Sequence, residues 1–385
     1  MKPTNPVFTG VKTTVFETMS RLAMAHDAIN LGQGFPDVDG PLDIREAAAD
    51  ALKTGPNQYP PMLGLPQLRQ AVADCNRRFY GLEVDWQREV MVTSGATEAL
   101  ADAIFALVEP GDEVVLIEPL YDCYLPLVRR AGGIVRRVRV SPPDWRLDVD
   151  ALRAAFSDRT KLVLLNNPMN PSAKVFTETE LGTIAQLCLE HDAYALCDEV
   201  YEHIVFDDRA HVPLMTLDGM RERTVRIGSA GKTFSLTGWK VGYITAPPHL
   251  LDPIAKAHQF VTFTTPPDLQ AAVAFGLNKP DDYYQGLAAE MQSKRQRIGE
   301  GLKKIGIPVL PCEGTYFVTC DMRELDLGDN DVAIAERLTK DAGVACVPVS
   351  AFYVSEGPAH FVRFCFCKKD TVIDAALERL ANFLK

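Results

Sequence analysis

Short apolar segments alternate with amphipathic segments from about residue 90 to residue 246. The apolar segments, rich in Val, Ile and Leu, predict strands at residues 90–94, 114–118, 161–166, 193–199, 224–229 and 242–246, of which 161–166 is expected to be buried. Apolar and polar residues alternate at 134–140, which predicts a further strand. Apolar side chains near the helical period predict helices at residues 96–108, 120–131 and 178–191. Strands that alternate with helices predict a mostly parallel sheet covered by helices on both faces, which makes this an α/β protein.

The pattern changes beyond this region. Residues 271–302 predict one long helix with a charged side, and the rest of the chain predicts a smaller α+β unit. Its expected strands are 314–321, 344–349 and 361–367, and its expected helices are 331–343 and 371–384. We expect residues 1–45 to form an N-terminal arm and part of the small domain, 46–280 the large domain, and 281–385 the small C-terminal domain.

Composition narrows the class of protein. The 385 residues are 47% hydrophobic and 24% charged, which is enough for a core in each of two domains. The net charge of −11 and the lack of a basic run argue against nucleic-acid binding. No apolar leader or membrane-length apolar run is present, so we expect a cytoplasmic protein.

The nine cysteines form no CxxC motif, and the seven histidines are dispersed. Cys365 and Cys367 are predicted to lie on the same face of a strand, without further ligands nearby. We interpret the cysteines as reduced thiols in the core and predict no metal site.

Polar side chains follow several of the predicted strands. They are Ser94 to Thr97, Tyr121, Asn167, Asn170, Asp198 and Lys232. Each has a structural explanation when taken alone: the serine and threonine can cap a helix, the Asn-Pro steps can form turns, and the aspartate can cap a loop. Because ligands bind beyond the carboxyl ends of strands in open α/β sheets, their common position favours a ligand site.

The chemistry of these groups suggests an anionic and electrophilic ligand. Asp198 follows an apolar run, so its carboxylate needs a partner such as a protonated ring nitrogen. The small-residue turn before the helix at 96–108 suits a phosphate. Lys232, near Ser229 and Lys240, suits either phosphate binding or attack on a carbonyl, since burial lowers the pKa of an amine.

Two further features have competing explanations. Arg363 alternates with large apolar residues, and could form an edge-strand ion pair or a fork for a substrate carboxylate. The GKT sequence at 231–233 resembles the end of a nucleotide-binding P-loop, but the required first glycine falls on Arg226. The acidic strand also precedes the lysine turn, which argues against a nucleotide hydrolase.

Seven segments in one order resemble a known family. They are NLGQGFPD (30–37), NQYPPMLG (57–64), TSGATEAL (93–100), EPLYDCY (118–124), NNPMNPSAKVF (166–176), CDEVYEHIVFD (197–207) and SAGKTFSLTGWKVGY (229–243). Over nearly its whole length the chain resembles the fold-type I, pyridoxal-phosphate-dependent aminotransferases of class I/II. Within that family the segments NLGQGFPD and CDEVYEHIVF most resemble those of the methionine and kynurenine aminotransferases. They are also similar to those of proteins assigned as N-succinyldiaminopimelate aminotransferases.

The resemblance implies a role for each matched residue. Lys232 would be the Schiff-base lysine, Asp198 would face the pyridine nitrogen, and Tyr201 and Asn170 would bond the ring hydroxyl oxygen. Tyr121 would stack on the ring. The phosphate would be held by Ala96, Thr97, Ser229 and Lys240, with Tyr59 from the second subunit of a homodimer. The substrate carboxylate would bind Arg363, Gly34 and Asn170, and Phe16 and Phe35 would line the side-chain pocket.

The implied activity is ping-pong transfer of an amino group between an L-amino acid and a 2-oxo acid. The aromatic pocket favours neutral, aromatic or sulfur-containing substrates over dicarboxylic ones. Three alternatives stay open at this point: an N-succinyldiaminopimelate aminotransferase, a cysteine-conjugate β-lyase on the same scaffold, and a non-catalytic cofactor-binding protein. Many relatives carry arginine where Lys240 stands, so the phosphate contacts are expected to differ in geometry.

Overall fold

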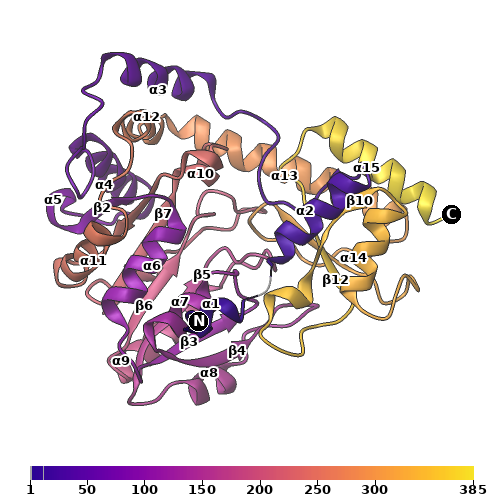
Figure 1. The fold of residues 1–385 in the computed structure, drawn as a ribbon, viewed down its shortest axis with the longest axis horizontal. Coiled ribbons are helices and arrows are strands. Elements are labelled where there is room, and N and C mark those ends of the chain that lie inside the picture. The colour runs from indigo at the N-terminus through magenta and orange to yellow at the C-terminus, as the bar shows by residue number, and fades with distance from the viewer. Residues whose placement is uncertain (1, 12) are drawn as a thin grey trace.

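A computed structural model describes residues 2–11 and 13–385 of the chain. Its centre is a seven-stranded sheet that crosses the larger part of the molecule (Figure 1). The strands, in spatial order, are β2 (Val90–Thr93), β8 (Gly242–Thr245), β7 (Thr224–Ser229), β6 (Tyr194–Asp198), β5 (Thr160–Asn166), β3 (Glu113–Glu118) and β4 (Ile134–Arg139). β8 is antiparallel to both neighbours and all other pairs are parallel, so the predicted mostly parallel sheet is confirmed.

Helices cover both faces of this sheet because alternate strand residues point to opposite faces. Leu162 and Leu164 of β5 join a buried cluster with α6 (Ala96–Leu107), α7 (Tyr124–Ala131) and α11 (Pro248–Val261). Val163 and Leu165 join a different cluster, with α8 (Val149–Ala155) and α9 (Glu178–Glu190). A third cluster involves α3 (Leu42–Thr54), α4 (Pro66–Tyr80) and α12 (Pro267–Leu277). The α/β fold class expected from the sequence is confirmed.

A second group of elements lies beside the sheet and contains the C-terminal end of the chain (Figure 1). Its sheets are β11 (Val347–Pro348), β12 (Phe361–Cys365) and β9 (Phe317–Asp321), and the pair β1 (Ile29–Asn30) and β10 (Val344–Ala345). Its helices are α2 (Val15–Ala25), α13 (Asp281–Lys304), α14 (Asp331–Lys340) and α15 (Asp370–Phe383). Met19 and Leu31 share one buried cluster with Ile298, Val362 and Ile373, so the N-terminal segment packs into the C-terminal unit.

Several expectations from the sequence were wrong in detail. The helix expected at 120–131 begins at Tyr124, the strand expected at 314–321 begins at Phe317, and the helix expected at 331–343 ends at Lys340. The single helix expected at 271–302 is two helices, α12 and α13, separated at residues 278–280. Pro280 has no backbone N–H and disfavours helical geometry at the preceding residue, so it separates them. The strand expected at 344–349 is divided between β10 and β11, which belong to different sheets, and the strand expected at 361–367 ends at Cys365.

The remaining short elements are connectors. They are α1 (Pro6–Thr9), α5 (Trp86–Glu89), α10 (Ala230–Thr233) and the 3₁₀ turns η1 (Leu214–Thr216), η2 (Thr237–Trp239) and η3 (Val349–Phe352). Among the described residues, none of the helices combines the length and the apolar composition that crossing a membrane requires.

Candidate functional site

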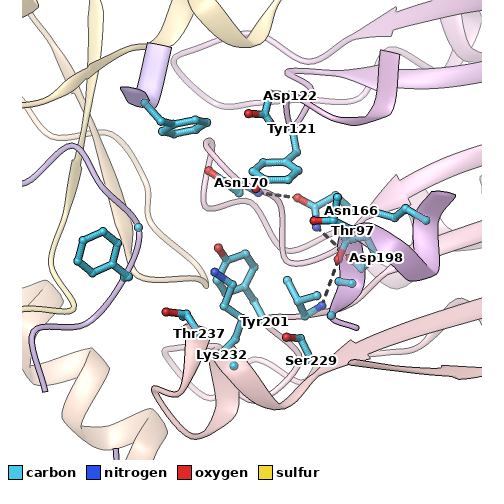
Figure 2. A pocket seen from close by; sticks show the side chains of 18 of the residues that line it. Thr97, Tyr121, Asp122, Asn166, Asn170, Asp198, Tyr201, Ser229, Lys232 and Thr237 are labelled. Carbon is cyan, nitrogen blue, oxygen red and sulfur yellow. Dashed lines mark hydrogen bonds between the residues drawn. The ribbon is translucent and has the colours of Figure 1, made fainter. Parts of the chain in front are cut away.

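A cavity of about 410 Å³ lies beyond the carboxyl ends of β5, β6 and β7. It is bounded by the turns that follow these strands and by the segment at 33–35 (Figure 2). Thirteen of the residues predicted from the sequence line it: Phe16, Gly34, Phe35, Ala96, Thr97, Tyr121, Asn170, Asp198, Tyr201, Ser229, Lys232, Lys240 and Arg363. Of the other candidates named from the sequence, Tyr59, Ser94 and Asn167 do not line it.

The acidic end of the cavity is formed at the end of β6. Asp198 is 5% exposed, and its Oδ2 accepts a hydrogen bond of 2.6 Å from the Tyr124 hydroxyl. Its backbone carbonyl accepts a bond of 2.9 Å from the Asn166 side-chain amide. Burial raises the pKa of Asp198, and the Tyr124 hydrogen bond opposes that rise. The carboxylate is therefore held in a fixed orientation and is short of positive partners.

Buried ion pairs behind the cavity fix the chain around Asp198 and Tyr201. Arg226 of β7 donates from its guanidinium to Glu199 and to Glu202. It also donates to the Asn76 side-chain oxygen at 2.7 Å. Because Glu199 follows Asp198 and Glu202 follows Tyr201, this network holds the turn that presents both site residues.

Lys232 lies in α10, directly after β7, on the opposite side of the cavity from Tyr121 (Figure 2). Its Nζ donates to the Tyr316 hydroxyl at 3.0 Å, and that hydroxyl donates to the Gly34 carbonyl at 2.7 Å. Burial is the main cause that lowers the pKa of Lys232. A lowered pKa increases the fraction of the free amine, which is the form that attacks carbonyls and accepts protons.

The N-terminus of α6 forms another side of the cavity. Gly95 precedes the helix with a φ of +82°, a conformation that favours glycine. A Cβ on Gly242 would lie 2.6 Å from the Gly95 carbonyl carbon. A side chain at residue 242 would therefore push β8 away from the turn before α6. The Lys240 Nζ lies 3.4 Å from the position that a Cβ on Gly95 would occupy. Free amide groups, the helix dipole and an ammonium group together suit an anion.

Behind this helix end lies a buried ionic cluster. His258 Nδ1 donates to Glu98 Oε1 at 2.5 Å and is 3.5 Å from Asp102 Oδ2, and its Nε2 is 3.1 Å from the Met62 carbonyl. Burial alone would lower the pKa of His258, but the hydrogen bonds and charges of the two carboxylates raise it to about 9. Glu98 also accepts from the Ser94 N–H, so the cluster braces the turn before α6.

These three side chains could each give one ligand atom to a metal ion, since the atoms lie within 4.8 Å of one another. A protonated imidazole satisfies the same geometry, because both ring nitrogens face acceptors. The sequence did not indicate this cluster, since residues 98, 102 and 258 come from two helices far apart in the chain.

The opposite end of the cavity contains a buried cation. Arg363 Nη1 donates to Asn170 Oδ1 at 2.8 Å and Nη2 donates to the Gly32 carbonyl at 2.6 Å. Its Nε is buried without a partner among the described residues, and its Cζ lies 3.9 Å from the centre of the Phe317 ring. No carboxylate of residues 2–11 or 13–385 is within 4.0 Å of this guanidinium, so a positive charge faces the cavity unpaired.

Gly34 approaches this end closely. A Cβ at Gly34 would lie 2.6 Å from Phe317 Cζ, so a larger residue would push the segment away. Phe16 packs edge-on against Phe352 at 5.7 Å and lies 6.4 Å from the Tyr121 ring. The cavity next to Arg363 is therefore bordered by aromatic rings.

Sequence reasoning missed several residues that contact the predicted ones, chiefly Tyr124, Asn166, Tyr316 and Phe317. Tyr124 follows Tyr121 by one helical turn, and this spacing could have indicated it. Tyr316 and Phe317 come from β9 and the turn before it, and no local signal connects them with Lys232 or Arg363.

Tyr59 lies outside the cavity on the surface. Its side chain is 82% exposed, and its ring packs edge-on against Phe263 at 5.4 Å. Two residues close to Phe263 in the sequence are also exposed: Phe260 is 84% exposed and Val261 is 52% exposed. A contiguous run of exposed apolar residues of this size is typical of a protein interface.

Comparison with known proteins agrees with this geometry. Residues 26–380 match the family model described as aminotransferase class I and II. The chain is 42% identical to the methionine aminotransferase of Escherichia coli, over 96% of this chain and 95% of that protein. It is 44% identical to a probable N-succinyldiaminopimelate aminotransferase of Mycobacterium tuberculosis, over 96% of each chain.

Among solved structures, the fold superimposes on that of YbdL from Escherichia coli, described as having a methionine aminotransferase function. The TM-score is 0.96 at 41% identity, covering 99% of this chain and 100% of the other. The enzyme class predicted from the sequence is confirmed. This chain belongs to the class I and II aminotransferases.

Proposed function

We propose that this aminotransferase moves the amino group of a neutral, aromatic or sulfur-containing L-amino acid to a 2-oxo acid by a ping-pong sequence, using pyridoxal 5′-phosphate. One observation carries the proposal. Lys232, Asp198 and Arg363 line a single cavity, and among residues 2–11 and 13–385 none of them has an ion-pair partner within 4.0 Å. Because unpaired buried charges are costly, such a set favours a ligand with complementary groups.

The donors and acceptors fit pyridoxal phosphate. Lys232 offers an amine for its aldehyde, and Asp198 offers a carboxylate for its ring nitrogen. Tyr201 and Asn170 would bond the ring hydroxyl oxygen, and Tyr121 would cover one face of the ring. The phosphate would take the anion site made by Ala96, Thr97, Ser229 and Lys240. Since Lys240 is a point charge, it would bind fewer phosphate oxygens in a fixed geometry than an arginine fork.

When bound, the cofactor supplies an aldehyde that combines with amines and a ring that accepts the electron pair released at the substrate α-carbon. Lys232 is the group suited to move the proton at that carbon, because burial lowers the pKa of its amine. Tyr316 holds the Lys232 amine by a hydrogen bond of 3.0 Å. Asp198 would keep a proton on the ring nitrogen by charge pairing in a site screened from water.

The substrate is oriented by its carboxylate. Arg363 presents its guanidinium to the cavity while Asn170 and Gly32 hold two of its nitrogens. The Gly34 backbone and the Asn170 side chain would complete the carboxylate site. The neighbouring Phe16 and Phe35 favour an apolar or aromatic substrate side chain.

Two alternatives on the same scaffold are kept, and the comparisons support the first of them. The 44% identity to a probable N-succinyldiaminopimelate aminotransferase favours a succinylated diamino acid as substrate. A cysteine-conjugate β-lyase would use the same amine and carboxylate sites. Release of pyruvate and ammonia from a cysteine conjugate, without added 2-oxo acid, would identify the lyase.

We propose a homodimer in which Tyr59 of one subunit contributes to the phosphate site of the other. Support comes from the exposure of Tyr59 together with Phe260 and Phe263. We also propose the domain division 1–45, 46–280 and 281–385, supported by the buried cluster that joins Met19 and Leu31 to the C-terminal elements. The cytoplasmic location expected from the sequence stays a prediction.

The test of the proposed function is an absorbance scan of protein purified with pyridoxal phosphate, titrated with a panel of amino acids. We expect a visible band that bleaches with aromatic and sulfur-containing amino acids. Borohydride treatment followed by peptide mapping should then find the modification on Lys232. An unmodified Lys232 in cofactor-saturated protein would contradict the proposal.

A further inference from the structure

Asp198 receives one short side-chain hydrogen bond, and it comes from a neutral group. The Tyr124 hydroxyl donates to Asp198 Oδ2 at 2.6 Å, whereas Oδ1 receives only a long contact of 3.4 Å from the Val200 N–H. Both side chains are buried, Tyr124 being 2% exposed and Asp198 5%. Among residues 2–11 and 13–385, no cationic side chain lies within 4.0 Å of this carboxylate, so the Tyr124 hydroxyl is its closest side-chain donor.

The fold places Tyr124 against two site residues at once. Tyr124 is the first residue of α7, and Tyr121 lies three residues before it, within the β3–α7 connection. Their rings pack edge-on at 5.9 Å. The Tyr124 ring is fixed in the buried cluster between the sheet and α6. The Tyr124 side chain thus contacts both the Asp198 carboxylate and the Tyr121 ring, which line the cavity.

The titratable groups around Asp198 do not replace the hydroxyl. Those whose charge acts on it or responds to it are Tyr121, Cys123, Cys197, Glu199, Tyr201 and Lys232. Burial is the largest influence and raises the pKa of Asp198, while the Tyr124 bond is the foremost influence that lowers it. Lys232 also lowers it, but its amine is the group that the proposed reaction uses.

We propose that Tyr124 is a positioning residue that keeps Asp198 ionised and aimed at the cofactor ring nitrogen. A hydrogen bond to the charged form of an acid favours that form. An ionised Asp198 can hold a proton on the ring nitrogen, whereas a protonated Asp198 keeps its own proton. The role rests on the proposed function, because it requires a ring nitrogen opposite Asp198.

The first experiment uses the cofactor-free protein. Infrared difference spectra recorded against pH should contain a protonated carboxyl band that is lost in Asp198→Asn. In Tyr124→Phe, which removes only the hydroxyl, the midpoint of this band should rise by about one pH unit, the equivalent of a lost hydrogen bond. The matched control is Tyr284→Phe, since Tyr284 is also buried and donates to the Leu277 carbonyl at 2.9 Å. An unchanged midpoint in Tyr124→Phe would overturn the proposal.

The second experiment uses the loaded enzyme and a cofactor methylated on its ring nitrogen, which carries a permanent positive charge. With ordinary pyridoxal phosphate, Tyr124→Phe should lower kcat by about 10- to 100-fold. With the methylated cofactor, the ratio of variant to wild-type activity should return towards one. An equal loss with both cofactors would mean that Tyr124 supports the fold and not the charge of Asp198, which would also overturn the proposal.

The two proposals fail differently. If the wild-type protein does not retain pyridoxal phosphate at Lys232, the proposed function fails, while the infrared midpoint still reports on the bond between Tyr124 and Asp198. If the wild-type protein retains the cofactor and Tyr124→Phe behaves as wild type in both experiments, only the role of Tyr124 fails.

Discussion

Arg363 gives the sharpest test of how substrates are selected. Its fork is fixed before any ligand binds, because Nη1 is held by Asn170 and Nη2 by the Gly32 carbonyl. The side chain is fully buried, so the cost of removing its charge from water is met on folding and not on binding. Replacing Arg363 by methionine removes the charge, and replacing it by lysine keeps the charge but removes the planar fork.

The structure sets the size of the expected effect. Two opposite charges about 4 Å apart at an effective dielectric constant of about 20 attract by about 4 kcal/mol. Truncating one member of a buried charge pair costs about 2–5 kcal/mol, which corresponds to a dissociation constant raised about 30- to 4,000-fold. We expect Arg363→Met to fall in this range and Arg363→Lys to lose less, since its charge remains.

The assay is the bleaching of bound cofactor, titrated with an amino acid and with the matching amine that lacks the carboxylate. Both variants should bind the amino acid more weakly and the amine with unchanged affinity. Arg297→Met is the control, because Arg297 pairs with Asp370 and Asp374 at the surface. If folded Arg363→Met binds the amino acid as tightly as the wild type, the carboxylate binds elsewhere and the reasoning is refuted.

Four further outcomes are expected. Lys232→Ala should bind pyridoxal phosphate but lose 2-oxo acid formation by several orders of magnitude, and near-normal turnover would contradict its role. Asp198→Asn should keep the melting temperature but lose most of kcat, and a mild loss would mean that another group holds the ring proton. Tyr59→Phe should weaken cofactor retention in dialysis, whereas a fully active monomer on gel filtration would exclude a shared site. His258 has a folded pKa of about 9, above its usual value, so its stabilising effect is complete below about pH 6.5 and is lost as the pH rises through 9. In urea unfolding His258→Gln should therefore be less stable than wild type by about 3–5 kcal/mol at pH 6 and by less at pH 9; an equal difference at both pH values would show that the imidazole is neutral.

Much of the fold was predictable because backbone geometry gives strands and helices different periods. The alternating apolar runs indicated the strands of the central sheet, and the sheet is mostly parallel as expected. The errors occurred where local pattern and chain path disagree. Residues 271–302 have helical periodicity throughout, but Pro280 divides them. Residues 344–349 are uniformly apolar, but the chain leaves one sheet after Ala345 and enters another at Val347.

The sequence by itself determined the α/β class, the enzyme family and the candidate residues at the strand ends, since strand ends and short motifs are local features. Only the tertiary structure decided which groups meet. Lys232 bonds Tyr316, Tyr316 bonds Gly34, and Tyr124 bonds Asp198, and these pairs are far apart in the chain. The physical reason is that the hydrophobic effect is not directional. It determines which faces of helices and strands are buried but not which residue each one meets, whereas a hydrogen bond requires two particular atoms within about 3 Å. For Tyr124 and Asp198 that requirement is met when α7 packs on the sheet, and for Tyr316 it is met only when the C-terminal unit and the segment at Gly34 pack against the sheet.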